Sequence, residues 1–150
     1  MKAVILAANY SPRLLPFTAT RAKPMIRIAG RPILESILDG LHNAGVHEAL
    51  VVVHHEHQAL QDYFGDGSNF GMSLEYVEQP ELLGIGHALS CCEPYLKLQP
   101  FLLIYGDVLA DGNPVPQLLR TFAETGREVA LVTLPRNSNE YGNVYLDNEM

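Results

Sequence analysis

The chain has 150 residues, 47% of them apolar and 18% charged, which is ordinary for one soluble α/β domain. Seventeen acidic and ten basic residues give a net charge of −7, which argues against a general nucleic-acid binder because such proteins need clustered cations. The longest apolar runs, such as residues 49–53, are too short to span a bilayer, which argues against a membrane protein. Residues 1–8 read as a strand and not as a signal peptide, so we expect a cytoplasmic protein.

The predicted elements alternate between strand and helix from the N-terminus onward. A short apolar run at residues 2–8 ends in a polar loop and predicts a buried strand. Arg31-Pro32 opens a helix whose apolar residues recur at helical spacing, and Gly45 follows its end. A second buried strand is expected at residues 49–53, and the helix after it stops at residues 65–67.

The second half of the chain continues this alternation. A strand at residues 72–77 is followed by a helix over residues 86–96, in which Pro94 predicts a kink. The remaining predicted elements are a strand at residues 101–105, a helix through Leu118, Leu119 and Phe122, and a strand at residues 129–134. Strands separated by crossover helices predict a doubly wound, mostly parallel Rossmann-like sheet with helices on both faces.

The C-terminus reads as an unfinished hairpin. Residues 143–146 have a strand pattern and residues 147–149 a turn pattern, but the chain stops at Met150, before a partner strand. An unpaired terminal strand leaves backbone hydrogen-bonding groups without partners. We therefore expect residues 1–150 to be part of a longer domain that is incomplete at its C-terminus.

Cysteine and histidine side chains are the residues to consider first for metal or redox chemistry. The two cysteines, Cys91 and Cys92, are adjacent in a predicted helix, so packing is the favoured interpretation. Residues 54–57 read His-His-Glu-His but lack the H-E-x-x-H spacing that places two imidazoles on one helical face, which argues against zinc. His87 opens a helix and fits a structural role as well as it fits contact with a ligand.

Several polar segments follow predicted strands, and ligands bind beyond the carboxyl ends of the strands in an open α/β sheet. These segments are residues 9–18, 79–87, 106–107 and 140–142. Their shared placement predicts one site of nucleotide size. On physical grounds alone, Arg13 and Lys23 fit solvated loop cations equally well, and Asp107 could cap the segment that follows it.

Short motifs recur in order along essentially the whole chain. Residues 6–14 read LAANYSPRL and residues 23–25 read KPM. The further motif residues are Gly30 to Leu34, Gln79, Leu83-Gly84, Gly106-Asp107 and Tyr141-Gly142. Together they resemble the signature of the sugar-1-phosphate nucleotidyltransferases, in which the first strand ends L-A-A-G and a G-x-G-T-R-L loop and a K-P-M element follow.

The resemblance implies an activity and a set of catalytic groups. A nucleoside triphosphate and a sugar 1-phosphate would give a nucleotide-sugar and pyrophosphate, with Mg²⁺ as cofactor. Arg13 and Lys23 would be the catalytic cations and Asp107 the metal ligand. Because the reaction joins two anions, cations and metal must neutralise the developing charge, and no protein nucleophile is required. The family's second metal-binding aspartate and its sugar-phosphate-contacting lysine would lie beyond Met150.

The resemblance also implies binding residues and a preferred base. The nucleotide-binding residues would be Leu6, Ala8, Asn9, Ser11, Gln79 and Gly84, and the sugar-binding residues would be Tyr141 and Gly142. Gln79 would pair with the edge of a pyrimidine. Residues 79–88 and 105–108 resemble most closely the uridylyltransferase half of the N-acetylglucosamine-1-phosphate enzymes, with L-G-T-G-H-A and Y-G-D-V, which favours UTP over dTTP. Ile85 stands where that branch has threonine.

The phosphate loop departs from the family at three neighbouring positions. Asn9 and Ser11 stand at the glycines, and Pro12 replaces the threonine or serine before the arginine. Asn9 tolerates the left-handed conformation that glycine allows. Pro12 has no N–H to donate, and the loss of one preorganised donor costs roughly 100- to 1,000-fold in rate.

Two functional hypotheses therefore stay open. The first is an active enzyme, which the retained Arg13, Lys23 and Asp107 favour. The second is a catalytically impaired relative that binds nucleotide-sugars as a regulatory or sensor subunit, which the altered loop favours. A dinucleotide-dependent dehydrogenase is disfavoured because no G-x-G-x-x-G follows the first strand. The sequence leaves a homo-oligomer open.

Overall fold

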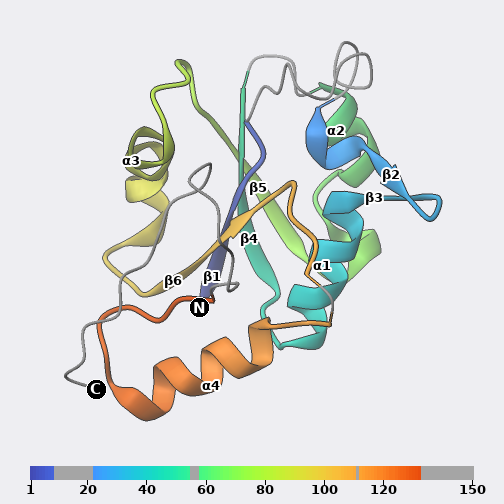
Figure 1. Ribbon diagram of the computed structural model, residues 1–150. Coiled ribbons are helices and arrows are strands. Elements are labelled where there is room, and N and C mark those ends of the chain that lie inside the picture. The colour runs from blue at the N-terminus through green and yellow to red at the C-terminus, as the bar shows by residue number, and fades with distance from the viewer. Residues whose placement is uncertain (9–21, 55–57, 111, 133–150) are drawn as a thin grey trace, which may run out of the picture. The chain divides into compact units, whose positions relative to one another are not determined.

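The computed structural model describes residues 1–8, 22–54, 58–110 and 112–132, and the chain divides into two compact units, Met1–Asp111 and Gly112–Met150. The first unit contains β1 (Lys2–Leu6), the 3₁₀ turn η2 (Lys23–Met25), β2 (Arg27–Ile28), β3 (Arg31–Pro32), α1 (Ile33–Asn43), β4 (Glu48–Val53), α2 (Gln58–Phe64), the 3₁₀ turn η3 (Ser68–Phe70), β5 (Ser73–Glu78), α3 (Ile85–Leu96) and β6 (Phe101–Tyr105). The second unit contains α4 (Val115–Thr125) (Figure 1).

The first unit is organised around a four-stranded parallel sheet in the order β5-β4-β1-β6. Strand β1 lies between β4 and β6, and Leu6 stands opposite Val52 on one side and Tyr105 on the other. Residues 3–6 and 49–53 are buried without interruption, as expected for strands covered on both faces. Burial in β5 and β6 is interrupted by exposed positions. The predicted parallel α/β architecture is confirmed.

Helices cover both faces of this sheet, with α1 and α2 on one side and α3 on the other (Figure 1). The core beneath α3 is a single cluster of Val4, Leu6, Leu50, Val52, Val77, Ala88 and Cys92. On the strands, the residues between these, such as Ile5 and Val51, are also fully buried. Because side chains alternate across a strand, they face the α1 and α2 layer. The sheet is therefore doubly wound, as predicted.

Helix α1 shows how closely local signals fix an element. Its buried residues are Ile33, Leu34, Ile37, Leu38 and Leu41, the apolar positions that predicted the helix. Beyond its C-terminus Gly45 adopts φ 79°, and the N–H of Val46 donates to Leu41 O at 3.0 Å. The N–H of Gly45 donates to His42 O, also at 3.0 Å. This is the glycine-dependent C-cap that the sequence predicted.

Helix α3 carries both cysteines, and its buried thiol is protected chemically. Cys92 is fully buried, and burial raises the pKa of its thiol to about 11. Cys91 is half-buried, and both thiols are free. Helical structure also continues past Pro94 to Leu96.

These thiols should therefore differ in reactivity. Because the thiolate is the reactive form, a thiol of pKa about 11 has roughly one part in a thousand as thiolate at pH 8. We expect an alkylating reagent to modify Cys91 promptly and Cys92 only after denaturation, as read by peptide mass mapping. Equal labelling of both residues in the native protein would contradict the buried position of Cys92.

One predicted strand has no strand structure over the residues that are described. The apolar run 129–134 was expected to be a strand, but residues 129–132 have no strand structure, and residues 133–134 lie outside the described residues. Strand structure requires ladder hydrogen bonds to a neighbouring strand, and a β-branched apolar run predicts only the tendency to form them. The predicted strand at 143–146 and the turn at 147–149 also lie outside the described residues.

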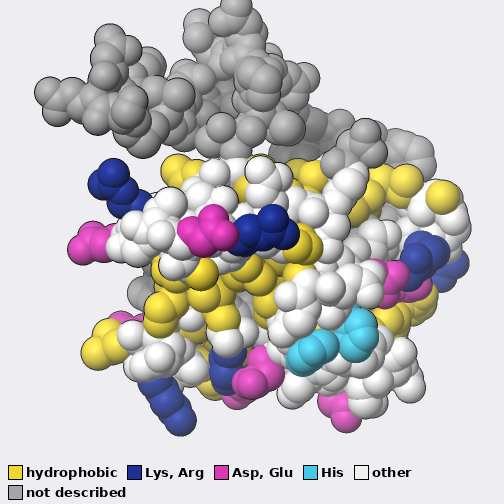
Figure 2. Space-filling model, turned by 90° about the horizontal axis from the view of Figure 1, so that it is seen from below, with side chains coloured by type: hydrophobic (Ala, Val, Ile, Leu, Met, Phe, Trp, Pro, Cys, Tyr) yellow, Lys and Arg dark blue, Asp and Glu magenta, His cyan; other side chains and the backbone are white. Residues whose placement is uncertain are grey.

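The end of the sheet where the strands begin carries a pair of histidines. The rings of His42 and His47 pack edge to face with their centroids 4.9 Å apart, and His42 Nδ1 lies 3.1 Å from Gly71 O. Figure 2 shows histidine side chains lying together on the face seen from below. This pair connects the end of α1 to the turn before β5.

None of the helices in the described ranges has the length and apolarity needed to cross a membrane.

Candidate functional site

The carboxyl ends of the four parallel strands lie at one edge of the sheet, so the segments that follow them converge there. Ala8 follows β1, Gln79 follows β5 and Asp107 follows β6. Two strands lie between β5 and β6, and three interstrand spacings amount to about 14 Å. A single nucleoside triphosphate can extend across that distance. The edge therefore offers one elongated site with Gln79 and Asp107 at its two ends.

At the β5 end, several of the predicted residues line one cavity. It has a volume of about 310 Å³, and its lining residues are Leu6, Ala8, Gln79, Leu82, Gly84, Ile85 and Ala88. The structure thus brings together Leu6, Ala8, Gln79 and Gly84, four of the six residues that the family resemblance implies for nucleotide binding. The lining is apolar except for the backbone and one amide side chain, which is the composition expected of a small-molecule site.

Gln79 is the buried polar group of this cavity, with 3% of its surface exposed. Its backbone N–H donates to Val53 O at 2.8 Å, and its carbonyl lies 2.8 Å from His54 Nδ1. Its side-chain Nε2 donates to Gly84 O at 3.2 Å. Both the backbone and the amide of Gln79 are therefore held by neighbours from β4 and from the start of α3.

Gly84 joins the loop after β5 to helix α3. Its backbone adopts φ 94° and ψ −176°, a combination that is essentially restricted to glycine. Its carbonyl accepts from the N–H of Ala88 at 3.1 Å, which closes the first turn of α3. The glycine of the Leu83-Gly84 motif is thus required by the turn into the helix, and the turn brings its carbonyl within reach of Gln79.

At the β6 end, Lys23 and Asp107 form an ion pair. Lys23 Nζ lies 2.8 Å from Asp107 Oδ2, and the side chains are 17% and 19% exposed. The two residues are 84 positions apart in the chain. Lys23 begins the η2 turn, which is anchored by the buried Pro24. The predicted catalytic cation and the predicted metal ligand are therefore in direct contact.

Gly106 explains how Asp107 reaches this position. The Gly106 N–H donates to Leu6 O at 2.9 Å, so the chain leaving β6 crosses close to the end of β1. A Cβ atom at this position would lie 2.8 Å from the same carbonyl oxygen, which real Cβ atoms essentially never do. Glycine is needed here for close backbone approach, and Asp107 follows it directly.

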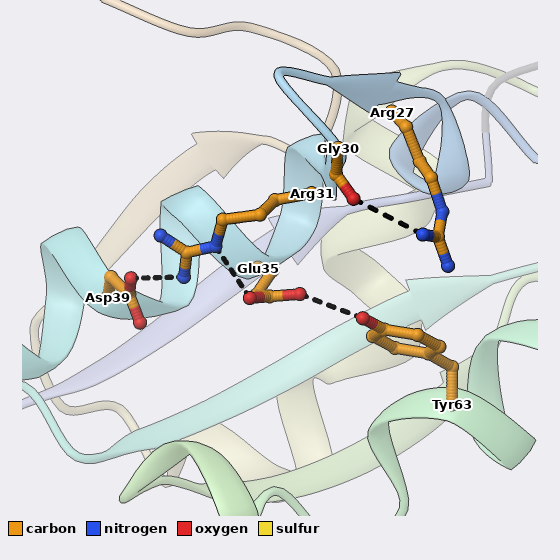
Figure 3. A network of polar contacts seen from close by, with 6 residues as sticks. All are labelled: Arg27, Gly30, Arg31, Glu35, Asp39 and Tyr63. Atoms are coloured by element: carbon orange, nitrogen blue, oxygen red, sulfur yellow. Dashed lines mark hydrogen bonds and ion pairs between the residues drawn. The ribbon is translucent and has the colours of Figure 1, made fainter.

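A network of polar side chains fixes the segment that follows Lys23 (Figure 3). Arg31 bridges Glu35 and Asp39 on α1, with Nε 2.6 Å from Glu35 Oε1. Tyr63 on α2 donates to Glu35 Oε2 at 2.9 Å, and this hydrogen bond raises the pKa of Tyr63. Exposed ion pairs contribute little stability individually. The network instead positions the β2–β3 hairpin after Lys23, because it connects this hairpin to α1 and α2.

The described residues contain no group of three or more His, Cys, Asp or Glu side chains that could hold a metal ion. His54 Nδ1 contacts the carbonyl of Gln79, and residues 55–57 lie outside the described residues. Asp107 offers one carboxylate beside the site, and Mg²⁺ commonly takes one or two carboxylates together with substrate phosphates and water. The donor set therefore fits Mg²⁺ bound jointly with a triphosphate.

Arg13, Asn9 and Ser11, predicted to contact the triphosphate, lie outside the described residues, as do Tyr141 and Gly142. The sequence did not indicate that Leu82 and Ala88 line the cavity, or that His54 contacts the backbone carbonyl of Gln79. An aliphatic side chain carries no sequence signal for such a role, whether it lies in a loop, as Leu82 does, or in a helix, as Ala88 does.

Comparison with known proteins agrees with this geometry. The family model described as nucleotidyl transferase matches residues 2–150. The chain belongs to this family. Within it, the chain is 32% identical over 142 residues to a glucose-1-phosphate thymidylyltransferase of Streptomyces antibioticus, covering 95% of the chain and 40% of the relative. It is 40% identical over 113 residues to the bifunctional protein GlmU of Methanococcus vannielii, covering 75% of the chain and 26% of the relative.

Solved structures of nucleotidyl transferase relatives share the fold. A UDP-glucose pyrophosphorylase complexed with UDP-glucose matches with a TM-score of 0.73 at 25% identity, over 83% of this chain and 54% of the other. The UDP-glucose pyrophosphorylase from Acinetobacter baumanii matches with a TM-score of 0.73 at 22% identity, over 83% and 53%. The chain spans about two fifths of the length of the curated relatives that it matches almost throughout, and about half of these solved chains.

Proposed function

We propose that the chain is the nucleotide-binding part of an enzyme that transfers a nucleotidyl group from UTP or dTTP to a sugar 1-phosphate. The observation that carries this proposal is the pairing of two sites along one edge of the sheet. One is an apolar cavity with the buried amide of Gln79, and the other is the Lys23–Asp107 pair. The first suits a base and the second suits a metal-bound triphosphate.

The chemistry follows from the charges. An oxygen of the sugar phosphate attacks the α-phosphorus, the bond from that phosphorus to the bridging oxygen breaks, and pyrophosphate leaves with the electron pair. Lys23 would neutralise charge on the phosphates, and Asp107 would hold Mg²⁺. Bound Mg²⁺ would supply further neutralisation of the same charge. Arg13 would act as a second cation, as the family resemblance implies.

The preference for a uracil or thymine base rests on the cavity and on the relatives. Gln79 offers an amide edge, which can pair with the edge of such a base. The curated relatives include a glucose-1-phosphate thymidylyltransferase and a UTP–glucose-1-phosphate uridylyltransferase of Bacillus subtilis. Both are named for pyrimidine nucleotides, and we extend that class to this chain.

The decisive test is turnover by the full-length protein. UTP or dTTP is supplied with glucose 1-phosphate or N-acetylglucosamine 1-phosphate and Mg²⁺, and pyrophosphate release is followed. We expect release with at least one pair, and none when Mg²⁺ is chelated. Absence of turnover with every pair, together with measurable binding of a nucleotide-sugar, would contradict the enzyme proposal.

That outcome would favour the second candidate, a regulatory or sensor subunit. The observation in its favour is the altered loop, with Asn9, Ser11 and Pro12 at positions where the family has glycines and a hydroxyl residue. A variant that restores glycine at Asn9 and Ser11 and threonine at Pro12 should then show measurable pyrophosphate release, because a preorganised phosphate donor returns. If turnover stays absent in this variant, the altered loop is not the reason that the wild-type protein lacks turnover.

A further inference from the structure

The loop between β5 and α3 is closed by contacts that also orient the amide of Gln79. Gln79 Nε2 lies 3.2 Å from Gly84 O and 3.3 Å from His87 Nδ1. His87 Nδ1 lies 2.9 Å from Glu81 O. The N–H of Leu83 also donates to Glu81 O, at 2.9 Å. One amide, one imidazole and two carbonyls therefore meet within a single turn, and their donor and acceptor roles depend on one another.

These distances leave one consistent assignment of hydrogens. A backbone carbonyl only accepts, so the 2.9 Å contact with Glu81 O requires a proton on His87 Nδ1. Gly84 O also only accepts, so the group facing it at 3.2 Å must be the NH₂ of Gln79 and not its oxygen. The remaining contact between Nε2 and Nδ1 has a hydrogen on both nitrogens and is not itself a hydrogen bond. An unprotonated Nδ1 or a reversed amide would place two acceptors against each other.

This assignment decides what Gln79 presents to the cavity. With Nε2 facing Gly84, the oxygen Oε1 points away from that carbonyl, and no described residue donates a hydrogen bond to it. Because no buried polar side-chain atom in the described residues lacks a partner, those residues do not fully enclose Oε1. Gln79 lines the cavity, so the cavity presents a hydrogen-bond acceptor of fixed orientation.

A fixed acceptor distinguishes two otherwise similar bases. Uracil carries a proton on N3 and can donate it to Oε1, whereas cytosine has a lone pair at N3 and would meet Oε1 with a second acceptor. An amide that could turn over would accept either base. We propose that His87 is a positioning residue for base selection, since its Nδ1–H holds Glu81 O and keeps the turn closed. This inference rests on the proposed function of the cavity as a base site.

The test measures base preference by calorimetry, with UTP and CTP titrated separately into the full-length protein without metal. We expect His87→Leu to reduce the UTP-over-CTP preference by about tenfold, the value of one hydrogen bond. His87→Asn, whose amide places a donor near the Nδ1 position, should keep the preference within about threefold. Ser90→Ala, which removes a hydrogen bond from Ser90 Oγ to His87 O at 2.8 Å, is the matched control and should keep the preference unchanged.

A double-variant comparison separates positioning from general structure. If His87 acts through the amide, His87→Leu should change the preference no further in a Gln79→Ala background. A loss of affinity for UTP and CTP by the same factor, or an unchanged preference in His87→Leu, would overturn the inference. Wild-type protein that binds both nucleotides without preference would overturn it while leaving triphosphate binding intact. Wild-type protein that binds neither nucleotide, with or without added Mg²⁺, would remove the proposed function as well.

A measurement on the unmodified protein covers the case in which the leucine variant does not fold. The neutral ring of His87 should carry its proton on Nδ1, which nitrogen-15 spectra of histidine rings report directly. A neutral ring protonated on Nε2 would overturn the inference, because Nδ1 could not then donate to Glu81 O.

Discussion

Replacing Lys23 with methionine is expected to strengthen the binding of a bare divalent ion and to weaken the binding of a nucleoside triphosphate. Lys23 Nζ lies 2.8 Å from Asp107 Oδ2 in an ion pair, so a metal ion that approaches this carboxylate must compete with the ammonium group. Both side chains are largely withdrawn from water, which limits screening. Removing the ammonium should raise Mn²⁺ affinity by about tenfold.

The same variant should lose catalysis. A triphosphate would bind the ammonium group of Lys23 while its metal binds the carboxylate of Asp107, so the wild-type pair would favour joint binding over binding of the ion alone. Without Lys23, we expect turnover to fall by roughly 100- to 1,000-fold. Calorimetry with Mn²⁺, with and without UTP, and pyrophosphate release provide the two readouts.

Lys2→Met is the matched control for this experiment. Lys2 pairs with Glu48 at 3.6 Å, and both residues lie at the end of the sheet where the strands begin, away from the candidate site. The control removes the same charge from an ion pair but should leave Mn²⁺ affinity and turnover unchanged. An unchanged or weaker Mn²⁺ affinity in Lys23→Met would show that the ammonium group does not compete for Asp107.

Gly106→Ala is expected to destabilise the protein and to disable the site together. The new Cβ would meet the Leu6 carbonyl oxygen at 2.8 Å, and that oxygen belongs to backbone inside the sheet and cannot move freely. Steric insertion of this kind costs about 1–3 kcal/mol. The chain must move away from β1, which displaces Asp107 from Lys23. A displacement of about 1 Å at a reacting site lowers turnover by about 100-fold.

Thermal denaturation and turnover of the full-length protein test this prediction. Gly86→Ala is the control, since a Cβ at Gly86 meets no atom of the described residues within 4 Å and the residue lies in helix α3. That substitution should leave stability unchanged or raise it by about 0.5–1 kcal/mol, because alanine favours helix over glycine. A Gly106→Ala variant as stable as Gly86→Ala would contradict the close approach of β6 to β1.

Much of the fold follows from patterns that sequence reasoning can detect. Continuous apolar runs predicted β1 and β4, because a strand buried on both faces is apolar at every position. Helical spacing predicted α1, because a helix buried along one side is apolar only at every third or fourth position. Residues 129–132 of the strand predicted at 129–134 have no strand structure, because a β-branched apolar segment has a tendency to pair but does not specify a partner strand. The parallel direction of the strands followed from the alternation of strands with helices.

The candidate site was accessible from sequence only in part. Gln79 and Asp107 could be placed at one edge because both follow strands of a parallel sheet. The contact between Lys23 and Asp107 could not be derived, since residues 84 positions apart carry no spacing signal. The role of His87 was equally hidden. Its partner is a backbone carbonyl, and any residue type in the turn would supply the same oxygen.

The order β5-β4-β1-β6 has a consequence for how base choice can evolve. Gln79 and the Lys23–Asp107 pair lie on opposite flanks of the sheet, separated by the two strands that are buried on both faces. Changes at sites more than about 10 Å apart that share no partners usually combine additively. If the chain has the proposed function, substitutions in residues 79–87 would alter which base is accepted and leave the phosphate chemistry at β6 undisturbed. Selection could then act on base recognition and on reactivity separately.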